Sequence, residues 1–203
     1  MRNIWPMGCK KTPDPEKVEE LLNSPYYSAQ PKIDGVRCIL HFDDLGQAHY
    51  TTRGSSSEDP FTPIDITHRL DHMRLCCPEM AGYELDGELY CPKYTSAEVA
   101  GQVNFRSRVP VDKDIKLYIF DILSTRSIHL ENESWAERQR ELQMIALWVW
   151  TTGFLEIVPT AYTSEEKRQL LAKELEEGRE GIVLKHIYSD YVFGTYKKDA
   201  KPS

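Results

Sequence analysis

The stretch Gln30-Pro31-Lys32-Ile33-Asp34-Gly35-Val36-Arg37 is the part of the sequence around which we expect the fold to be arranged. It places a lysine two residues before an acid, a glycine directly after that acid, and an arginine two residues further on. An aspartate followed by a glycine favours a tight turn, and the alternation that follows indicates the start of a strand. We therefore expect a turn that exposes Lys32 where the strand begins.

A lysine in such a turn becomes a nucleophile only when its surroundings favour the free amine. In water the pKa of a lysine side chain is about 10.4, so the group is protonated near pH 7. Neighbouring cations, a metal ion or removal from water lower that pKa, and the free amine then forms covalent intermediates. Arg37 supplies one such cation, and its planar guanidinium also suits phosphates and sugar hydroxyls. The alternative is an ordinary loop before a strand, with Lys32 and Arg37 in water.

The composition is that of an ordinary globular protein. The chain has 203 residues, 40% of them hydrophobic and 28% charged, which is enough for one substantial domain. The net charge of −7 argues against non-specific binding to a polyanion, although basic side chains could still converge on one groove. No stretch resembles a signal peptide or a membrane span. The five cysteines follow no regular spacing, so we expect reduced thiols and a cytoplasmic location, in a bacterial cell or a virus-infected host cell.

The spacing of apolar residues predicts alternating strands and helices. Residues 55–63 are polar and rich in turn formers, which predicts a loop. We expect strands over 35–42, 49–52, 82–90, 117–123, 154–158 and 181–187, a hairpin turn over 43–46, and helices after Asp14-Pro15, over 64–75, and after capping boxes that begin at Thr95, Ser134 and Thr163. The helix over 64–75 has Ile66, Leu70 and Met73 at helical spacing, and the helix after Ser134 carries Leu142, Ile145 and Val149 on one face. This order predicts an α+β fold with mixed, largely antiparallel sheets flanked by helices.

The strand predicted over 82–90 carries three acids on one face. Glu84, Asp86 and Glu88 alternate with apolar residues and a glycine, so their side chains project to the same side. Like charges on one strand face are unfavourable unless a positive group lies opposite. A divalent cation or a sugar hydroxyl would explain the arrangement, and the solvent face of an edge strand is the common alternative.

Two further strands carry candidate ligand-binding residues. In the stretch 180–185, Val183 and Lys185 point the same way and would offer an apolar surface and a cation to one ligand. The alternative is a buried strand that ends in a lysine whose charge reaches water. Phe120 precedes Asp121 in an otherwise apolar strand, where an aromatic side chain is usually part of the core.

Taken together and in this order, these stretches resemble the covalent nucleotidyltransferase superfamily, and within it the ATP-dependent DNA ligases of the small viral or bacterial type. The matching motifs are Lys32-x-Asp34-Gly35-x-Arg37, Arg53-Gly54, Asp86-Gly87-Glu88, Phe120-Asp121 and Glu180 to Lys185. They cover most of the chain, so the resemblance is specific. It implies the fold of a DNA ligase nucleotidyltransferase (ATP-grasp-like) domain over residues 1–203, acting as a monomer.

The resemblance also implies the chemistry. Lys32 would attack the α-phosphate of ATP, expel pyrophosphate and hold AMP as a phosphoramidate. AMP would pass to the 5′-phosphate of nicked double-stranded DNA, and the 3′-hydroxyl would then displace AMP and seal the nick. Mg²⁺ would be required, kept largely by its own waters.

The family pattern implies a place for each motif residue around the nucleotide. Arg37 and Glu88 would hold the ribose, and Arg53 would contact phosphates. Lys185 would neutralise charge on the α-phosphate. The base would lie between Phe120 and Val183, with Gln30 and Pro31 at its edge, and the metal would be held by Glu88 and Glu180.

The last residues depart from the family pattern. Members continue into a lysine motif close to K-x-K and an OB-fold domain, and Lys197, Lys198 and Lys201 do not match that motif. The stretch 191–194 resembles the segment that precedes it. We therefore expect both the final motif and the OB-fold to be absent, with poor self-adenylation and weak binding of nicked DNA as the result.

Three other functions are compatible with part of the pattern. An RNA ligase and an mRNA capping guanylyltransferase share the lysine motif, the latter using GTP. A catalytically silent nucleotide-binding module is the alternative from a different class. The joint retention of Lys32, Glu88, Glu180 and Lys185 argues against the silent module.

Overall fold

The computed structural model describes residues 4, 6–8, 14–53 and 63–194. Its strands are β1 (Tyr27–Pro31), β2 (Val36–Phe42), β3 (Ala48–Thr52), β4 (Ile64–Asp65), β5 (Glu84–Tyr90), β6 (Lys116–Ser124), β7 (Leu155–Ile157) and β8 (Ile182–His186). Its α-helices are α1 (Pro15–Asn23), α2 (Ser96–Val103), α3 (Trp135–Met144), α4 (Ala146–Thr152) and α5 (Ser164–Glu176), and short 3-10 turns are η1 (Thr67–Arg69), η2 (Asp71–Met73) and η3 (Pro78–Met80).

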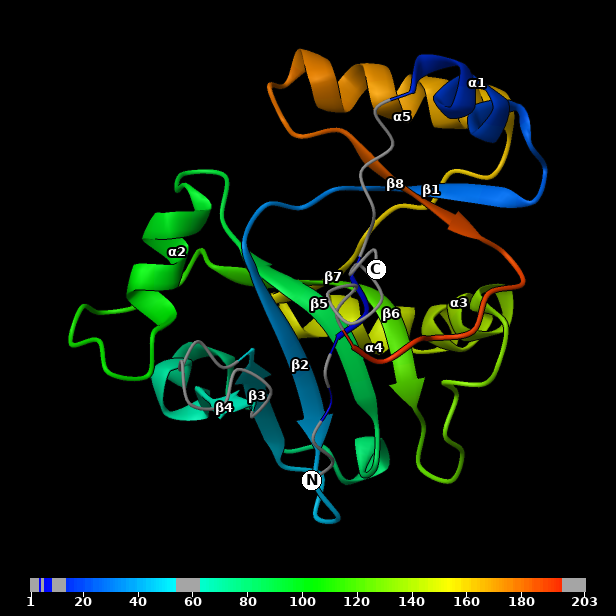
Figure 1. Cartoon of the computed structure of the whole chain (residues 1–203). Coiled ribbons are helices and arrows are strands. Elements are labelled where there is room, and N and C mark those ends of the chain that lie inside the picture. The colour runs from blue at the N-terminus through cyan, green and yellow to red at the C-terminus, as the bar shows by residue number, and fades with distance from the viewer. Residues whose placement is uncertain (1–3, 5, 9–13, 54–62, 195–203) are drawn as a thin grey trace, which may run out of the picture.

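The strands form two sheets (Figure 1). One has six strands in the order β4-β3-β2-β5-β6-β7, and the other pairs β1 with β8. Every strand pair is antiparallel except β6 with β7. The predicted α+β fold with mixed, largely antiparallel sheets is therefore confirmed.

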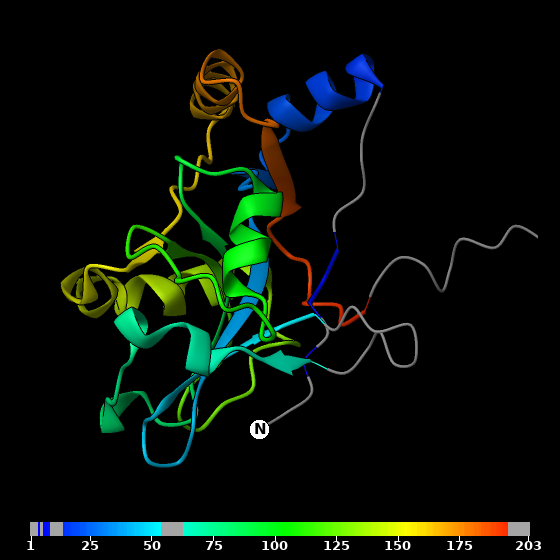
Figure 2. The ribbon, with the colours of Figure 1, turned by 90° about the vertical axis from the view of Figure 1, so that its left-hand side faces the viewer.

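The two faces of the six-stranded sheet have different partners. Helices α2, α3 and α4 cover one face and close the main hydrophobic core (Figure 2). Leucines of β2, β5 and β6 supply that core, as the period of two predicts. On the other face, Ile39 and Leu123 pack in a smaller cluster with Ile4 and Tyr191. This second face is the one that carries the acids of β5.

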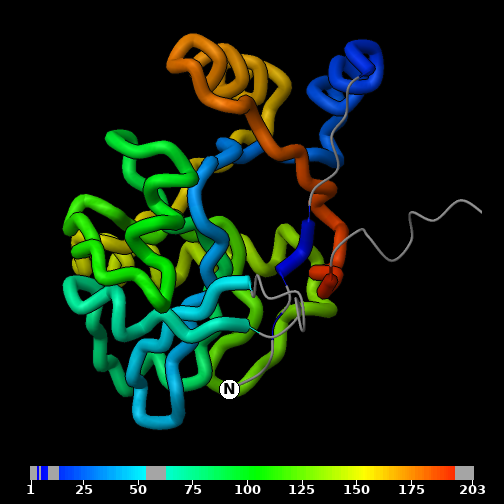
Figure 3. Tube along the Cα trace, turned by 60° about the vertical axis from the view of Figure 1, so that its left-hand side comes forward, coloured from blue at the N-terminus to red at the C-terminus, as the bar shows by residue number. Residues whose placement is uncertain are grey.

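The two-stranded sheet sits apart with its own helices (Figures 1 and 3). Helix α5 packs on β1 and β8, and α1 packs on α5. The buried ammonium of Lys167 donates to the carbonyl oxygens of Ser24 at 2.7 Å and Tyr27 at 2.9 Å. It thereby fixes the turn between α1 and β1, and burial lowers its pKa.

The capping boxes were predicted correctly. At Thr95, Ser134 and Thr163 the side chain accepts from the backbone N–H three residues on, and the glutamate there reaches back to the cap. Helix α1 also begins as predicted, with the carboxylate of Asp14 accepting from Glu16 and Lys17. The predicted loop over 55–63 lies mostly outside the described residues.

The helix predicted over 64–75 is wrong. The chain there forms β4 and the turns η1 and η2, although Ile66, Leu70 and Met73 are buried as predicted. The carboxylate of Asp65 accepts from the N–H of Thr67 at 2.7 Å, and the Thr67 hydroxyl accepts from Tyr50. Such side-chain contacts to the backbone compete with helical hydrogen bonds, so the apolar spacing alone was misleading.

The helix predicted to carry Leu142, Ile145 and Val149 on one face is interrupted. Ile145, with φ −97° and ψ 3°, separates α3 from α4. All three side chains still face the main core. The predicted face was therefore right, and the continuity of the helix was not.

Candidate active site

Lys32 follows directly after β1 and lies beside Glu180. Its backbone N–H donates to the carbonyl of Gly181 at 2.9 Å, which carries the pairing of β1 with β8 one residue further. Its ammonium forms a hydrogen-bonded ion pair with the Glu180 carboxylate, and the two side chains remain 35% and 47% exposed. Both line a cavity of about 160 Å³ with Asp34 and Arg179. The predicted exposed lysine is thus present with one counter-ion.

Gly35 allows the lysine loop to run against β5. A Cβ on Gly35 would lie 2.1 Å from the carbonyl oxygen of Leu89, a distance that no side chain permits. The close approach brings the N–H of Gly35 near the Glu88 carboxylate, where it lowers the pKa of that group. A larger residue at position 35 would therefore separate Lys32 from the acidic strand.

Arg37 and Asp86 form a buried bidentate pair. The guanidinium donates through Nε and Nη2 to the two carboxylate oxygens, each at 2.6 Å, and the Tyr191 hydroxyl donates to the same carboxylate at 2.5 Å. Strand β5 lies between β2 and β6 and is not an edge strand. Arg37 therefore supplies a positive charge beside these acids, and the alternative of an edge strand facing solvent is wrong.

Glu88 is the acid whose protonation is most altered. It lies directly across from Arg37 in the pairing of β2 with β5. Burial raises its pKa to about 7, against the lowering effect of the Arg37 charge, while Asp86 raises it further. Arg53, exposed just beyond β3, is close enough that its charge also lowers this pKa. Glu88 is therefore only partly ionised at neutral pH.

Phe120 lies beside two cations. The pairing of β5 with β6 shifts between Asp86 and Gly87, and Phe120 is the extra residue at this bulge. The guanidinium carbon of Arg37 lies 4.4 Å from the ring centroid, and the Lys185 ammonium lies 4.9 Å from it. Lys185 is 12% exposed and 3.9 Å from Asp121, and burial lowers its pKa.

Gln30 and Val183 are directly opposite one another in the small sheet, and Pro31 faces Ile182. The Gln30 amide is buried and lies within hydrogen-bond distance of the carbonyl of Phe120, at 3.4 Å. The small sheet and the bulge of β6 therefore meet at this side chain. The predicted base-edge residues thus lie next to the predicted stacking residue.

Arg138 and Tyr191 are two buried polar residues that the sequence did not assign to the site. Arg138 forms a bidentate pair with Asp121 at 2.8 and 3.0 Å, which positions the strand segment that follows Phe120. A signal existed, because Arg138 shares the buried face of α3 with Trp135 and Leu142 at helical spacing. A charged residue at such a position needs a buried partner.

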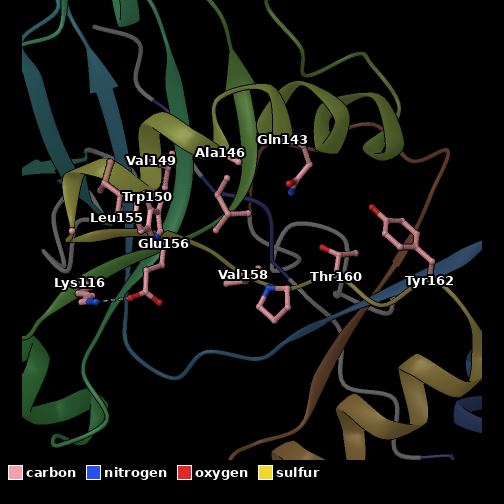
Figure 4. Close-up of a pocket in the computed structure, with 13 residues that line it drawn as sticks. Lys116, Gln143, Ala146, Val149, Trp150, Leu155, Glu156, Val158, Thr160 and Tyr162 are labelled. Atoms are coloured by element: carbon pink, nitrogen blue, oxygen red, sulfur yellow. Dashed lines mark hydrogen bonds and ion pairs between the residues drawn. The ribbon is translucent and has the colours of Figure 1, made fainter.

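A second cavity, larger than the one at Lys32, lies elsewhere (Figure 4). Its volume is about 820 Å³, and it is lined by α4 and the segment from β7 to Tyr162. A Lys116–Glu156 ion pair at 2.5 Å borders it. Thr160 lies at one end of this cavity, and none of the predicted site residues lines it.

The described part of the chain holds neither a cluster of metal ligands nor a helix that could span a membrane. No three His, Cys, Asp or Glu side chains there are grouped as metal ligands. No described helix is long and apolar enough to cross a bilayer. Any metal at Glu180 or Glu88 would thus need ligands from its own waters or from a bound substrate.

Comparison with known proteins identifies one family. Residues 6–201 match the family described as ATP dependent DNA ligase domain. DNA ligase 4 of Gallus gallus is 24% identical over 196 residues, which span 93% of this chain and 21% of that protein. The chain therefore covers about a fifth of this curated relative.

Solved structures share the fold. The ATP-dependent DNA ligase of bacteriophage T7, in complex with ATP, superposes with a TM-score of 0.61 at 19% identity, over 95% of this chain and 66% of that one. A mycobacterial DNA ligase D complexed with ATP and MES gives 0.66 at 18% identity, over 95% and 57%. The Chlorella virus DNA ligase-adenylate gives 0.62 at 18% identity, over 96% and 63%.

Proposed function

We propose that this chain, which belongs to the family of ATP-dependent DNA ligase domains, transfers AMP from ATP to Lys32. The observation that carries the proposal is the setting of Lys32. Its amine is exposed in a cavity, paired with Glu180, and attached to a loop that contacts Glu88 through Gly35. The amine is accessible to a phosphate, and the neighbouring carboxylate could take its proton, as a general base beside a nucleophile does.

The chemical step is a displacement at phosphorus. The Lys32 nitrogen would bond to the α-phosphorus as the bond from that phosphorus to the bridging oxygen of the β-phosphate breaks and pyrophosphate leaves. Glu180 accepts a hydrogen bond from the Lys32 ammonium, so it is placed to receive the proton that the amine must lose. Such transfers are catalysed mainly by positioning and by cations placed where negative charge develops. Lys185 supplies one such cation.

The nucleoside would occupy the space between the two sheets. We propose that the base stacks on Phe120 and is covered by Val183, with Gln30 and Pro31 at its edge. Glu88 would accept hydrogen bonds from the ribose. Because Arg37 is already paired with Asp86, it would hold the ribose only through the donors that remain free, and the exposed Arg53 would reach phosphates.

The carboxylates of Glu88 and Glu180 would suit Mg²⁺, a metal that is held largely by water and by substrate phosphates. It takes few protein ligands, usually one or two carboxylates beside substrate phosphates. Glu180 is half exposed beside Lys32, and Glu88 lies against the same loop, so both fit this habit. When bound, Mg²⁺ would offset charge on the phosphates.

The partner in the later steps is proposed to be nicked double-stranded DNA. AMP would move from Lys32 to the 5′-phosphate at the nick, and the neighbouring 3′-hydroxyl would then displace it. We propose that the domain over residues 1–203 does this as a monomer in the cytoplasm. Family membership supports DNA over RNA as the substrate.

Intact mass spectrometry tests the first step. The chain is incubated with ATP and Mg²⁺ beside a Lys32→Ala variant and a parallel sample with GTP. We expect a gain of one AMP that is absent in the variant and not reproduced as GMP. An AMP gain that survives Lys32→Ala would reject Lys32 as the nucleophile, and a GMP gain of equal size would favour the guanylyltransferase alternative.

A nicked duplex tests the later steps. Adenylated chain, freed of ATP, is mixed with a duplex that is labelled at the 5′-phosphate of a nick. We expect adenylated strands to appear first and sealed strands only slowly, because the chain is expected to bind nicked DNA weakly. A matched duplex with RNA flanking the nick gives the comparison, and preference for that duplex would turn the proposal toward RNA ligation.

A further inference from the structure

Four segments of the chain meet at one buried amide cluster. Gln30 of β1 and Gln139 of α3 are 1% and 2% exposed. Between them come the carbonyl of Phe120 and the hydroxyl of Thr160, which follows β7. Two hydrogen bonds of 2.8 Å between Ala29 and Ala161 hold the segment of Thr160 against β1. The geometry of the cluster is therefore fixed from both sheets.

A backbone carbonyl sets the direction of the hydrogen bonds. The carbonyl oxygen of Phe120 can only accept, and it lies 2.8 Å from Nε2 of Gln139. The oxygen of the Gln139 amide, Oε1, therefore faces Gln30. It accepts a hydrogen bond from Gln30 Nε2 at 3.3 Å. Thr160 Oγ1 accepts from the same Nε2 at 3.0 Å. The nitrogen of Gln30 is thus committed to this cluster.

The oxygen of the Gln30 amide has no part in this cluster. Gln30 Oε1 is buried and has no hydrogen-bond partner among the described residues. A buried acceptor without a donor is unfavourable, so such an atom often marks a place that a ligand completes. Val183 lies directly opposite Gln30, and Phe120 lies within hydrogen-bond distance of its amide, so the unpaired oxygen belongs to the proposed base subsite.

We propose that Gln139 and Thr160 are positioning residues that lock the Gln30 amide with its oxygen toward the base, and that this lock selects adenine over guanine. Adenine carries an amino group at position 6, which donates to a carbonyl oxygen. Guanine carries an oxygen there, which would oppose the oxygen of Gln30. The inference rests on the proposed function, because it takes the base to lie at Gln30.

The lock explains why Gln30 cannot simply rotate to suit guanine. A half-turn of the amide would bring its oxygen against Oε1 of Gln139, which the carbonyl of Phe120 holds in place. Two acceptors would then face each other in a buried site. The Thr160 hydroxyl could turn to donate to that oxygen, so Gln139 sets the direction of the amide and Thr160 holds it in place. Removing either side chain would free the amide from this orientation.

Binding of ATP and GTP to matched variants tests the lock. Gln139→Leu and Thr160→Val remove the two acceptors with little change in volume, whereas Thr160→Ser keeps the hydroxyl. Gln143→Leu is the control, because it makes the same change one turn further along α3 at an exposed position. Dissociation constants for both nucleotides with Mg²⁺ are measured by calorimetry, and folding is checked by the thermal midpoint.

We expect the unmodified chain, Thr160→Ser and Gln143→Leu to prefer ATP to the same degree. In Gln139→Leu and Thr160→Val the ratio of the two constants should fall about tenfold, since one hydrogen bond no longer discriminates. If a substitution only destabilised the fold, the affinities for ATP and GTP would fall equally and their ratio would not change. Should one variant fail to fold, the other carries the test.

The two proposals fail in different ways. Equal affinity of the unmodified chain for ATP and GTP, or an unchanged ratio in a folded Gln139→Leu chain, would overturn the lock. Because the ratio is read from binding, it does not depend on attack by Lys32. A ratio that falls as expected in a chain that never gains AMP would support the lock and reject the proposed covalent chemistry.

Discussion

At the scale of single residues, three of the cations proposed to meet the nucleotide are already close to a carboxylate. Lys32 is paired with Glu180, Arg37 with Asp86, and Lys185 lies 3.9 Å from Asp121. These carboxylates hold the cations in place before any phosphate arrives, which reduces the reorganisation that the reaction requires. An incoming phosphate must compete with Glu180 for Lys32, so the exposed pair is the one expected to change on binding.

Glu88 should make stability and ribose binding depend on pH in opposite directions. Its folded pKa of about 7 lies above the ordinary value of 4.5, so the folded chain binds the proton more tightly than the unfolded chain. Its contribution to stability is full below pH 4.5 and is lost as the pH rises through 7. Ribose binding should strengthen over the same rise, because the ionised carboxylate is the better acceptor.

Urea unfolding and ATP titrations at pH 5 to 8 check this expectation. The difference in unfolding free energy between the unmodified chain and Glu88→Gln should shrink as the pH rises, and Glu88→Gln should flatten the ATP profile. Glu176→Gln, at an exposed position in α5, is the control for removal of one acid. The same pH profile in all three chains would contradict the prediction.

Asp86→Asn should destabilise the chain by about 3 kcal/mol, because it leaves a mostly buried guanidinium without its carboxylate. The substitution also leaves a single oxygen to accept from both Arg37 and Tyr191, where the carboxylate offers two. Adding Arg37→Met should recover part of the loss, since the two residues act as a pair. Denaturant unfolding of the single and double variants measures both effects, and strictly additive losses would show that the pair is not coupled.

Sequence predicted which residues gather here better than it predicted how they pair. Motif order placed Arg37, Glu88 and Phe120 in one site, and the structure brings them together. Yet Arg37 bonds Asp86 and not Glu88, its direct neighbour in the register. Both acids share one face of β5, so a two-residue period cannot tell which of them a long side chain reaches.

At the scale of elements, capping chemistry was the part of the sequence that located helices most accurately. Ser134 begins α3, the helix that carries both Arg138 and Gln139. Ser134→Ala should lower stability by about 1 kcal/mol, because the backbone N–H of Glu137 loses its acceptor. Ser127→Ala makes the same change at an exposed position outside the helices. Equal unfolding midpoints for these two variants would contradict the role of the cap.

The failure over 64–75 shows why apolar spacing is weaker than capping as a guide. Ile66, Leu70 and Met73 are buried, so the periodicity reported burial correctly. Their backbone, however, is fixed by partners distant in sequence. The Tyr50 hydroxyl donates to the carbonyl of Met73 at 2.7 Å, and Arg69 donates to the carbonyl of Gln102 at 2.9 Å. Hydrogen bonds between residues so far apart in sequence override local helix propensity, and they cannot be predicted from a single sequence.

At the scale of the whole molecule, buried polar contacts join the two sheets. The Gln30 cluster links β1 to β6 and α3, and the N–H of Ala136 in α3 donates to the carbonyl of Ile187 after β8 at 2.9 Å. Figure 3 shows the β1–β8 body standing above the larger one, with the chain crossing between them. Polar joints of this kind fix geometry more than they add stability, which suits a site assembled from both bodies.

Arg138 makes the buried polar contacts whose loss should destabilise both sheets. It is fully buried, pairs with Asp121 of β6, and donates to the carbonyl oxygens of Glu133 at 2.7 Å and Ser189 at 3.2 Å. Arg138→Met should cost about 3 to 5 kcal/mol, because Asp121 stays buried without its main partner. Hydrogen exchange should accelerate more in β8, which leads to Ser189, than in β3 at the far side of the large sheet.

A control substitution in the same helix distinguishes the loss of the Arg138 contacts from a general effect on α3. Arg140→Met changes an exposed arginine two residues further along α3 and should leave both stability and exchange nearly unchanged. Adding Asp121→Asn to Arg138→Met should reduce the loss, because the uncompensated charge disappears. Uniform acceleration of exchange over β3 and β8 would mean that Arg138 stabilises the whole fold and has no particular role in holding the small sheet. Acceleration confined to β8 would show that this one side chain holds the small sheet against the strand that carries Phe120.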